Sequence, residues 1–180
     1  MILGIAGPAG AGKDTVADYL VSQHGFVKLA FAGPLKEMLA AAGFPEPADR
    51  DDKEKQLFGF NFTWRQAAQQ LGTEWGRALD RNIWVKIVSQ RAIECIGRGQ
   101  NVVLSDVRFE NEAVLIRGPL EGAILHLVGR QADIGDAASH VSESGVAFDP
   151  RSDFRINNSG HLELLYEQVD MALREQGFHA

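Results

Sequence analysis

The chain has 180 residues, of which 45% are hydrophobic, and a formal net charge of -6 at pH 7. This size suits one globular domain with a buried core, and the acidic balance argues against a protein that binds nucleic acid over a broad basic face. The single cysteine, Cys95, excludes an intramolecular disulfide and a cysteine-rich zinc site. No stretch approaches the roughly 20 apolar residues of a membrane span and no basic leader opens the chain, so we expect a cytoplasmic protein without membrane partners.

The N-terminal segments alternate between strand-like and helix-like patterns. The apolar run 1–6 predicts a strand, and the helical spacing of apolar residues within 14–25 predicts a helix that a glycine ends. Residues 26–32 predict a second strand. Pro34 then opens a helix that runs to about Ala42, because proline is favoured in the first helical turn.

The middle of the chain is irregular at first and then helical. Residues 43–62 are rich in proline and charge, and we favour a solvated surface insertion there over a binding segment. Thr63 begins a T-x-x-Q capping box, which predicts the start of a helix over 63–80. Asp80 is a suitable cap for a following helix over 81–97.

The C-terminal half again alternates strands and helices, and a long polar loop follows residue 128. In chain order, the predicted elements are a strand at 101–109, a helix to about Arg117, strands at 122–128 and 154–157, and a helix at 161–176.

Strands separated by helices predict an α/β fold, because parallel neighbouring strands need a helical crossover. We expect three layers, a mostly parallel five-stranded sheet with helices on both faces. Residues 1–180 would form one domain.

The stretch GPAGAGKDT carries the strongest chemical signal. Gly7, Gly12 and Lys13 meet the phosphate-loop pattern G-x-x-x-x-G-K-[ST], but Asp14 stands where Ser or Thr normally holds Mg²⁺. The loop leaves a predicted strand and enters a predicted helix, so its backbone N–H groups would converge on one anion. Gly10 adds further freedom for the backbone to approach a phosphate. The predicted nucleotide site in this loop therefore consists of Gly7, Gly10, Ala11, Gly12, Lys13, Asp14 and Thr15.

A second signal is Asp106, at the end of the apolar strand NVVLSD. Its position fits the Walker-B carboxylate that holds Mg²⁺ directly or through water, although an aspartate after a strand is also a common helix cap. Asp14 has three open roles: it could bind Mg²⁺ directly, bind it through water, or orient the loop. Thr15 offers a hydroxyl nearby. Asp14, Thr15 and Asp106 are thus the predicted metal residues.

Phosphoryl transfer concentrates negative charge between donor and acceptor, so cationic side chains near predicted strand ends and loop mouths are candidate site residues. Arginine suits this task because its planar fork binds phosphate through two hydrogen bonds. The candidates are Lys36, Arg65, Arg77, Arg108 and Arg130.

The ordered motifs of the chain resemble those of the phage-type deoxynucleoside monophosphate kinases, a family within the nucleoside monophosphate kinase branch of P-loop proteins. The similarity rests on GPAGAGKDTVADYL, FAGPLKEML, QQLGTEWGR, VVLSDVRFENEA, HVSES and RINNSG, and it is weakest in residues 43–62 and at the C-terminal tail. LGTE-x-GR combined with DVRF-x-NE is its most specific part. In that family an aspartate follows the loop lysine, as Asp14 does here.

The resemblance implies a P-loop NTPase three-layer sandwich with a lid loop. Residues 1–180 would form one kinase domain, with an inserted acceptor-binding helical region at about 43–98 and a lid at about 129–149. The resemblance also implies transfer of the ATP γ-phosphate to a deoxynucleoside 5′-monophosphate, with Mg²⁺ as cofactor and a homodimer as a possible assembly. Lys13 would bind ATP, Arg108 would act near the transferring group, and Arg130 would be a lid arginine. Asn158 to Gly160 would pass near the adenine. The residues implied around the acceptor are Lys36, Arg65, Thr73, Glu74 and Arg77.

Other residues and other functions stay open. Tryptophans are more often packing elements than stacking platforms, but Trp84 is kept as a candidate substrate-binding residue. His140 and Glu143 match the family motif, and we interpret them as ordering a loop. Two rival functions remain: a P-loop kinase of another phosphorylated acceptor, of the dephospho-coenzyme A or phosphomevalonate type, and a non-catalytic nucleotide-binding module.

Overall fold

The computed structural model describes residues 1–49, 51–129 and 145–178. The chain divides into two compact units, one made of Met1–Ala30 with Ser89–Ala180 and the other of Phe31–Val88. We refer to them as unit 1 and unit 2. Unit 2 begins before the inserted region that the sequence suggested, because α2 belongs to it.

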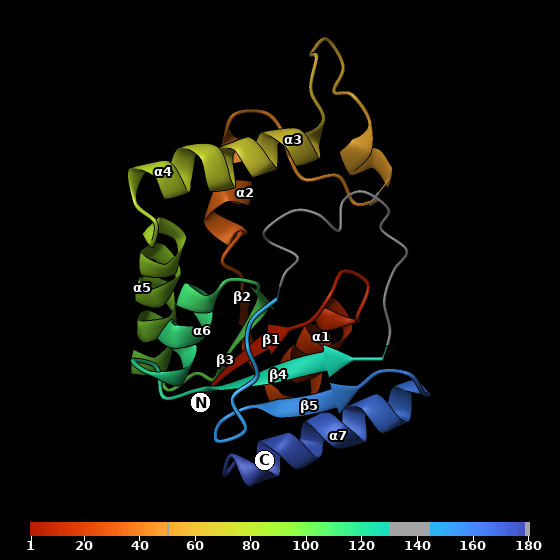
Figure 1. The fold of residues 1–180 in the computed structure, drawn as a ribbon, viewed down its shortest axis with the longest axis vertical. Coiled ribbons are helices and arrows are strands. Elements are labelled where there is room, and N and C mark those ends of the chain that lie inside the picture. The colour runs from red at the N-terminus through yellow and green to blue at the C-terminus, as the bar shows by residue number, and fades with distance from the viewer. Residues whose placement is uncertain (50, 130–144, 179–180) are drawn as a thin grey trace. The chain divides into compact units, whose positions relative to one another are not determined.

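Unit 1 contains a five-stranded parallel sheet with the order β2-β3-β1-β4-β5 (Figure 1). This arrangement confirms the expected α/β class. β2 is shorter than expected, because it pairs with β3 over only three residues before the chain turns into the next helix. The strands are β1 (Ile2–Ala6), β2 (Val27–Leu29), β3 (Val102–Val107), β4 (Ala123–Val128) and β5 (Phe154–Asn157).

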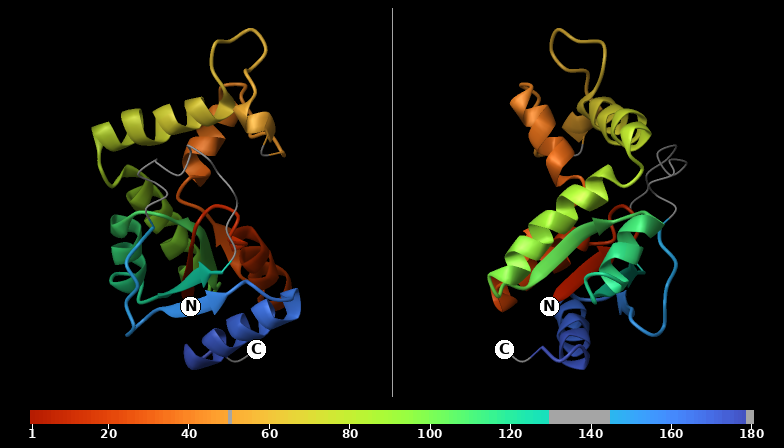
Figure 2. Two further views of the ribbon diagram at one scale, coloured as in Figure 1. Left: turned by 45° about the vertical axis from the view of Figure 1, so that its right-hand side comes forward. Right: turned by 90° about the vertical axis from the view of Figure 1, so that its left-hand side faces the viewer.

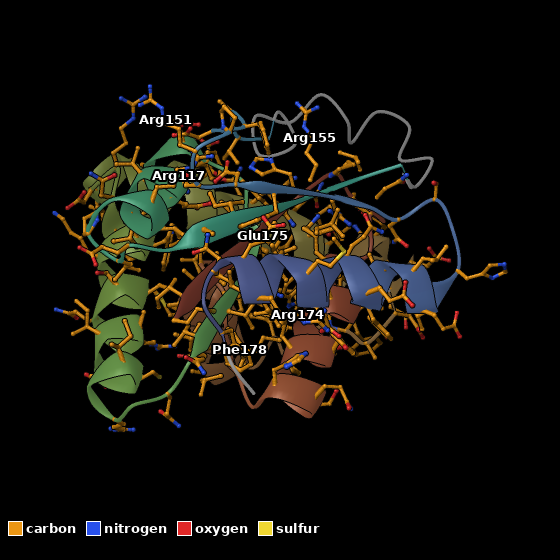
Figure 3. All side chains as sticks on the ribbon, turned by 90° about the horizontal axis from the view of Figure 1, so that it is seen from below. Arg117, Arg151, Arg155, Arg174, Glu175 and Phe178 are labelled. Carbon is orange, nitrogen blue, oxygen red and sulfur yellow. The ribbon has the colours of Figure 1, made fainter. Side chains whose placement is uncertain are left out.

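Helices cover both faces of this sheet. Leu3 and Ile5 of β1 contribute to a core with α1 (Lys13–His24) and α7 (Leu162–Glu175). Between them Gly4 faces the other way, where Ile116 of α6 (Glu110–Arg117) approaches so closely that a Cβ on Gly4 would lie 2.7 Å from it. Figure 3 shows α1 and α7 on one side of the strands and α6 on the other. None of the described helices has the length and apolar character needed to cross a membrane.

β1 lies in the middle of the sheet, between β3 and β4. The connection through α1 leads to β2 and β3 on one side, while β4 and β5 lie on the other. Ligands of open α/β sheets bind beyond the carboxyl ends of the strands, at the point where the strand order diverges. In this chain that point is the end of β1, where the glycine-rich loop begins.

Unit 2 is helical, and Figure 2 shows α2 beside the run that starts with α3. Its core contains Leu35, Leu39, Trp64 and Trp84. The elements are α2 (Gly33–Ala41), the 3-10 turn η1 (Asp51–Glu54), α3 (Trp64–Gln69), the π-helix η2 (Gln70–Gly76) and α4 (Arg77–Leu79); α5 (Ile83–Gly97) begins in unit 2 and ends in unit 1.

The helix predicted over 63–80 is present but is not one continuous α-helix. Its capping box is confirmed, because Thr63 Oγ1 accepts from the Gln66 N–H at 3.1 Å and Gln66 Oε1 accepts from the Thr63 N–H at 2.9 Å. The centre widens into η2, where Gly72 and Gly76 lie against other side chains. Trp84 is so close to Gly76 that a Cβ there would lie 2.5 Å from the indole ring. Sequence periodicity does not distinguish such a π-turn from an α-helix.

Residues 43–62 have more structure than a solvated insertion would require. η1 lies within them, and Gln56 forms an antiparallel bridge with Thr63. Phe44 meets the rings of Phe60 and Phe62 edge-on, with centroids 5.1 and 5.7 Å apart. Part of the segment is therefore packed within unit 2.

Candidate functional site

The glycine-rich loop runs from the end of β1 into the first turn of α1, as its motif requires. Gly7 and Gly12 both have positive φ values, +149° and +92°, that favour glycine. Both also lack space for a side chain. A Cβ on Gly7 would lie 2.9 Å from the Leu127 carbonyl oxygen, and one on Gly12 would lie 2.5 Å from Asn158 Nδ2. The two glycines of the motif are thus required by backbone conformation and by close packing.

Lys13 folds back over this loop. Its ammonium group donates hydrogen bonds to the carbonyl oxygens of Gly7 at 2.7 Å and Pro8 at 2.9 Å. These contacts hold the positive charge over the loop, where the backbone N–H groups at the start of α1 also favour an anion. A bound phosphate would compete with neutral carbonyls for the ammonium hydrogens, and charge-assisted hydrogen bonds are the stronger ones.

Asn158, at the exit of β5, supports the loop from a distant part of the sequence. Its amide group is buried and donates to the Ala11 carbonyl at 2.8 Å, while its backbone N–H donates to Val128 O at 2.8 Å. The side chain therefore fixes the loop rather than projecting into solvent. The expected place of Asn158 near the adenine stays a prediction.

Asp14 lies in the first turn of α1 and pairs with Lys28 of β2. Lys28 Nζ lies 2.9 Å from carboxylate oxygens of both Asp14 and Asp18. Burial alone would lower the pKa of Lys28, but the hydrogen bonds with the two carboxylates raise it above the ordinary lysine value. The Asp14 side chain remains largely exposed, so Lys28 orients its carboxylate without covering it.

Asp106 is near the end of β3, beside the start of the loop. The register between β1 and β3 shifts between Gly4 and Ala6, so that Ala6 pairs with Val107. Such an irregularity changes the direction of nearby side chains and is frequent next to functional sites. Within the described ranges, no group of three or more His, Cys, Asp or Glu residues could hold a metal ion. Mg²⁺ needs fewer protein ligands, because it keeps several waters and is completed by substrate phosphates.

Arg108 follows β3, and its backbone is held by a residue that we did not select from the sequence. Glu112 is buried, and its Oε2 accepts hydrogen bonds from the N–H groups of Arg108 at 2.8 Å and Phe109 at 3.0 Å. This carboxylate fixes the turn that carries Arg108 at the start of α6. The signal was present in DVRF-x-NE, but a glutamate in a first helical turn is so common that spacing alone did not indicate this role.

A buried ionic cluster lies at β4, the strand next to the β1 strand that leads into the loop. The sequence motifs did not indicate this cluster. Asp153 pairs with Arg117 at 2.5 Å and with His126 at 2.9 Å, and its carboxylate accepts from the Asp149 N–H at 2.9 Å. His126 is beside Ala6 in the register of β4 with β1. Burial alone would raise the pKa of Asp153, but the Arg117 hydrogen bonds keep it below its ordinary value, whereas burial lowers the pKa of His126.

This cluster also attaches the segment that follows residue 144. Arg117 donates to the Ala147 carbonyl at 2.6 Å. The guanidinium carbon of Arg155 lies over the Phe148 ring, 4.5 Å from the centroid of that ring. Arg117 and Arg155 are labelled in Figure 3. Arg130, His140 and Glu143, together with most of the expected lid at 129–149, lie outside the described residues.

The residues predicted around the acceptor all lie in unit 2. Lys36 pairs with Glu46 at 2.9 Å, Arg65 forms an ion pair with Glu54, and Arg77 donates to the Arg81 carbonyl at 3.4 Å. Thr73 and Glu74 belong to the π-helix η2.

Trp84 is the predicted substrate residue whose surroundings favour another role. Its ring is 3% exposed, and its N–H donates to the Gly72 carbonyl at 2.7 Å. A ring enclosed in this way packs unit 2 and offers no face for a base to stack on. The core-packing alternative therefore replaces the stacking role. The motif LGTEWG supplies the glycines that accommodate this indole.

Comparison with solved structures agrees with the fold. The chain aligns with a sugar kinase from Janibacter sp. HTCC2649 at a TM-score of 0.52 and 16% identity, covering 96% of this chain and 93% of that one. A gluconokinase from Sinorhizobium meliloti 1021 aligns at a TM-score of 0.50 and 15% identity, covering 96% and 91%. At these identities the likeness concerns the fold alone.

Sequence comparison is more specific. A protein of Acanthamoeba polyphaga mimivirus, provisionally named a deoxynucleotide monophosphate kinase, is 28% identical over 184 residues that cover 94% of each chain. The deoxynucleotide monophosphate kinase of Escherichia phage RB69 is 31% identical over 118 residues, which span 63% of this chain and 47% of the phage protein. The family profile described as deoxynucleotide monophosphate kinase matches residues 52–169, a region that starts after the phosphate loop. The loop geometry and the profile are thus separate observations, and together they show that the chain belongs to the deoxynucleotide monophosphate kinase family.

Proposed function

We propose that this protein transfers the γ-phosphate of ATP to a deoxynucleoside 5′-monophosphate, giving the diphosphate and ADP. The observation that carries the proposal is the match of residues 52–169 to the kinase family, in a chain whose preceding segment folds as a phosphate loop. The match covers Arg65, Thr73, Glu74 and Arg77 of the predicted acceptor residues, though not Lys36. The loop is the part that P-loop kinases of all acceptors share.

On the donor side, the loop and Lys13 would bind the β- and γ-phosphates of ATP. Lys13 would exchange the carbonyls of Gly7 and Pro8 for phosphate oxygens as charge develops in the transition state. Asn158 would keep the loop in shape through its bond to Ala11. Arg108, fixed through the backbone by Glu112, would neutralise charge on the transferring group.

Asp14, Thr15 and Asp106 would hold Mg²⁺, whose positive charge would neutralise part of the charge on the phosphates. Oxygen ligands fit this ion, and the exposed carboxylate of Asp14 at the loop suits it, as does Asp106 at the irregular end of β3. Lys28 would set the direction of the Asp14 carboxylate toward the phosphates. Thr15 adds a hydroxyl in the first turn of α1.

No side chain needs to act as a strong general base, because the acceptor phosphate is already an anion at neutral pH. The remaining task is alignment and charge neutralisation. In unit 2, Lys36, Arg65 and Arg77 are the cations that would bind the acceptor, with Thr73 and Glu74 near them.

The test is ADP release with Mg-ATP in the presence of each deoxynucleoside monophosphate and each ribonucleotide counterpart. Strong stimulation by one or more deoxynucleotides is the expected result. A Lys13→Ala preparation, purified in the same way, controls for contaminating kinases. A folded protein that binds ATP and is stimulated by none of these acceptors would contradict the proposal, and phosphorylation of dephospho-coenzyme A or phosphomevalonate would assign it to a rival class.

A further inference from the structure

Glu46 of unit 2 lies between two lysines that come from different elements. Its carboxylate pairs with Lys36 of α2 at 2.9 Å and with Lys53 of η1 at 2.5 Å. Lys36 is one of the predicted acceptor residues, whereas no sequence motif indicates a role for Lys53. One carboxylate therefore brings the ammonium groups of Lys36 and Lys53 to a common point.

Glu46 and Lys53 are both held in position by other residues of unit 2. Pro45 and Pro47 flank Glu46 and restrict its backbone. The Lys53 ammonium lies 5.5 Å from the ring centroid of Trp64, a cation–π contact. Trp64 is buried and donates its indole N–H to the Phe44 carbonyl at 3.1 Å. The position of Lys53 is thus set by a rigid ring and not only by its ion pair.

The charges of the cluster do not cancel. Two ammonium groups face one carboxylate, which leaves one positive charge in excess. Burial alone would raise the pKa of Glu46, but the hydrogen bonds from Lys53 and Lys36 hold it below its ordinary value, so the carboxylate is ionised at neutral pH. A phosphate monoester carries a charge of about -1.5 to -2 at pH 7 and offers three acceptor oxygens, so it matches two lysines better than a carboxylate does.

We propose that Lys53 binds the phosphate of the acceptor nucleotide together with Lys36, and that Glu46 occupies both lysines until this phosphate displaces it. The inference rests on the proposed function and adds a binding residue and an internal competitor to it. It also gives a basis for selectivity, because a neutral nucleoside cannot displace the carboxylate whereas its 5′-monophosphate can.

The experiment measures the dissociation constant of the best deoxynucleoside monophosphate by titration calorimetry without ATP, together with steady-state kinetics. Lys53→Met should weaken binding of the monophosphate by about tenfold or more, since a charge-assisted hydrogen bond is lost. The KM for ATP should stay unchanged. Glu46→Gln should change binding in the opposite direction, tightening it severalfold, because the ionised competitor is gone.

Lys55→Met is the matched control. Lys55 follows η1, is exposed and pairs with Asp52 at 2.6 Å, so it has the same charge in the same segment without contacting the Glu46 cluster. Binding of the monophosphate should change less than twofold in this variant. Thermal unfolding followed by circular dichroism shows whether each variant is folded, and Lys53→Gln replaces Lys53→Met if the latter is not.

Opposite changes in the two variants would support displacement. Weaker binding in both Lys53→Met and Glu46→Gln, with a lower unfolding temperature in both, would show that the cluster only stabilises the fold and would overturn the inference. Unchanged binding in Lys53→Met would overturn it too. A wild-type protein that phosphorylates a deoxynucleotide while Lys53→Met binds it normally refutes this inference alone, whereas a wild type without any deoxynucleotide turnover refutes the proposed function as well.

Discussion

Replacing Gly12 by alanine tests whether Asn158 truly supports the phosphate loop. Gly12 has φ +92°, and a Cβ there would lie 2.5 Å from Asn158 Nδ2 but 3.9 Å from the next side chain, Leu127. The new methyl group would therefore collide with the amide group that donates to the Ala11 carbonyl. Two separate costs should add in this variant.

The first cost is backbone strain, about 1–2 kcal/mol for a residue with a side chain in this conformation. The second is the loss of the Asn158 hydrogen bond, which leaves a buried donor and acceptor unpaired and costs about 1–3 kcal/mol. Gly12→Ala should therefore lower the free energy of unfolding by about 2–5 kcal/mol. Urea unfolding at 25 °C, followed by circular dichroism, measures it.

Gly25 provides a matched control at the other end of α1. It has φ +67°, and a Cβ there would have no neighbour within 4 Å. Gly25→Ala should thus show the backbone cost alone, about 1–2 kcal/mol. The difference between the two variants isolates the contact with Asn158.

A double-mutant cycle with Asn158→Ala completes the test. In that background the bond to Ala11 is already absent, so Gly12→Ala should cost only the backbone strain. The two substitutions should be non-additive by about 1–3 kcal/mol. Additive free energies, or equal losses in Gly12→Ala and Gly25→Ala, would refute the argument that Asn158 holds this loop.

Three further predictions concern Lys13, Trp84 and His126. Lys13→Ala should lower kcat by at least about a hundredfold with an unchanged circular dichroism spectrum, because it removes a cation that stabilises the transition state, and full activity in the folded variant would contradict the site. Trp84→Phe should cost about 1–3 kcal/mol in urea unfolding, because a buried carbonyl loses its donor, while Trp75→Phe at an exposed position should cost almost nothing. Because burial lowers the pKa of His126 in the folded state, the unfolded chain takes up its proton first on acidification, so stability should fall as pH drops below about 6.5. His126→Gln should reduce this slope, and an identical pH profile would show that His126 does not contribute to it.

The fold could be predicted because its signals are local. The strands β1, β3 and β4 are short, mainly apolar runs, and the capping box at Thr63 marks a helix start that the structure confirms. The phosphate loop was recognisable because a strand and a helix flank its glycines. The π-helix η2 could not be predicted in this way, since its widened turn depends on packing around Gly72 and Gly76 rather than on a change of period.

The support of the site is not local, and this explains which residues were missed. Asn158 reaches Ala11 across 147 positions of sequence, and no pattern near either residue indicates the contact. Glu112 is close to Arg108, but its role depends on a buried carboxylate facing two amides, which spacing alone does not show. The motifs therefore indicated the residues that would contact phosphate. They did not indicate the residues that hold those residues in position.

The internal partner of a cationic residue also affects how tightly that residue can bind phosphate. Lys13 is bound to loop carbonyls, Lys36 to Glu46, and Arg65 to Glu54. A phosphate that binds any of them must first replace an internal partner, so the net affinity is the difference between two sets of contacts and not the strength of one. Replacing the cation removes the contact with phosphate, whereas neutralising its internal partner removes the competitor. Opposite effects of the two substitutions on affinity are therefore the result that separates a binding cation from one that serves only the fold.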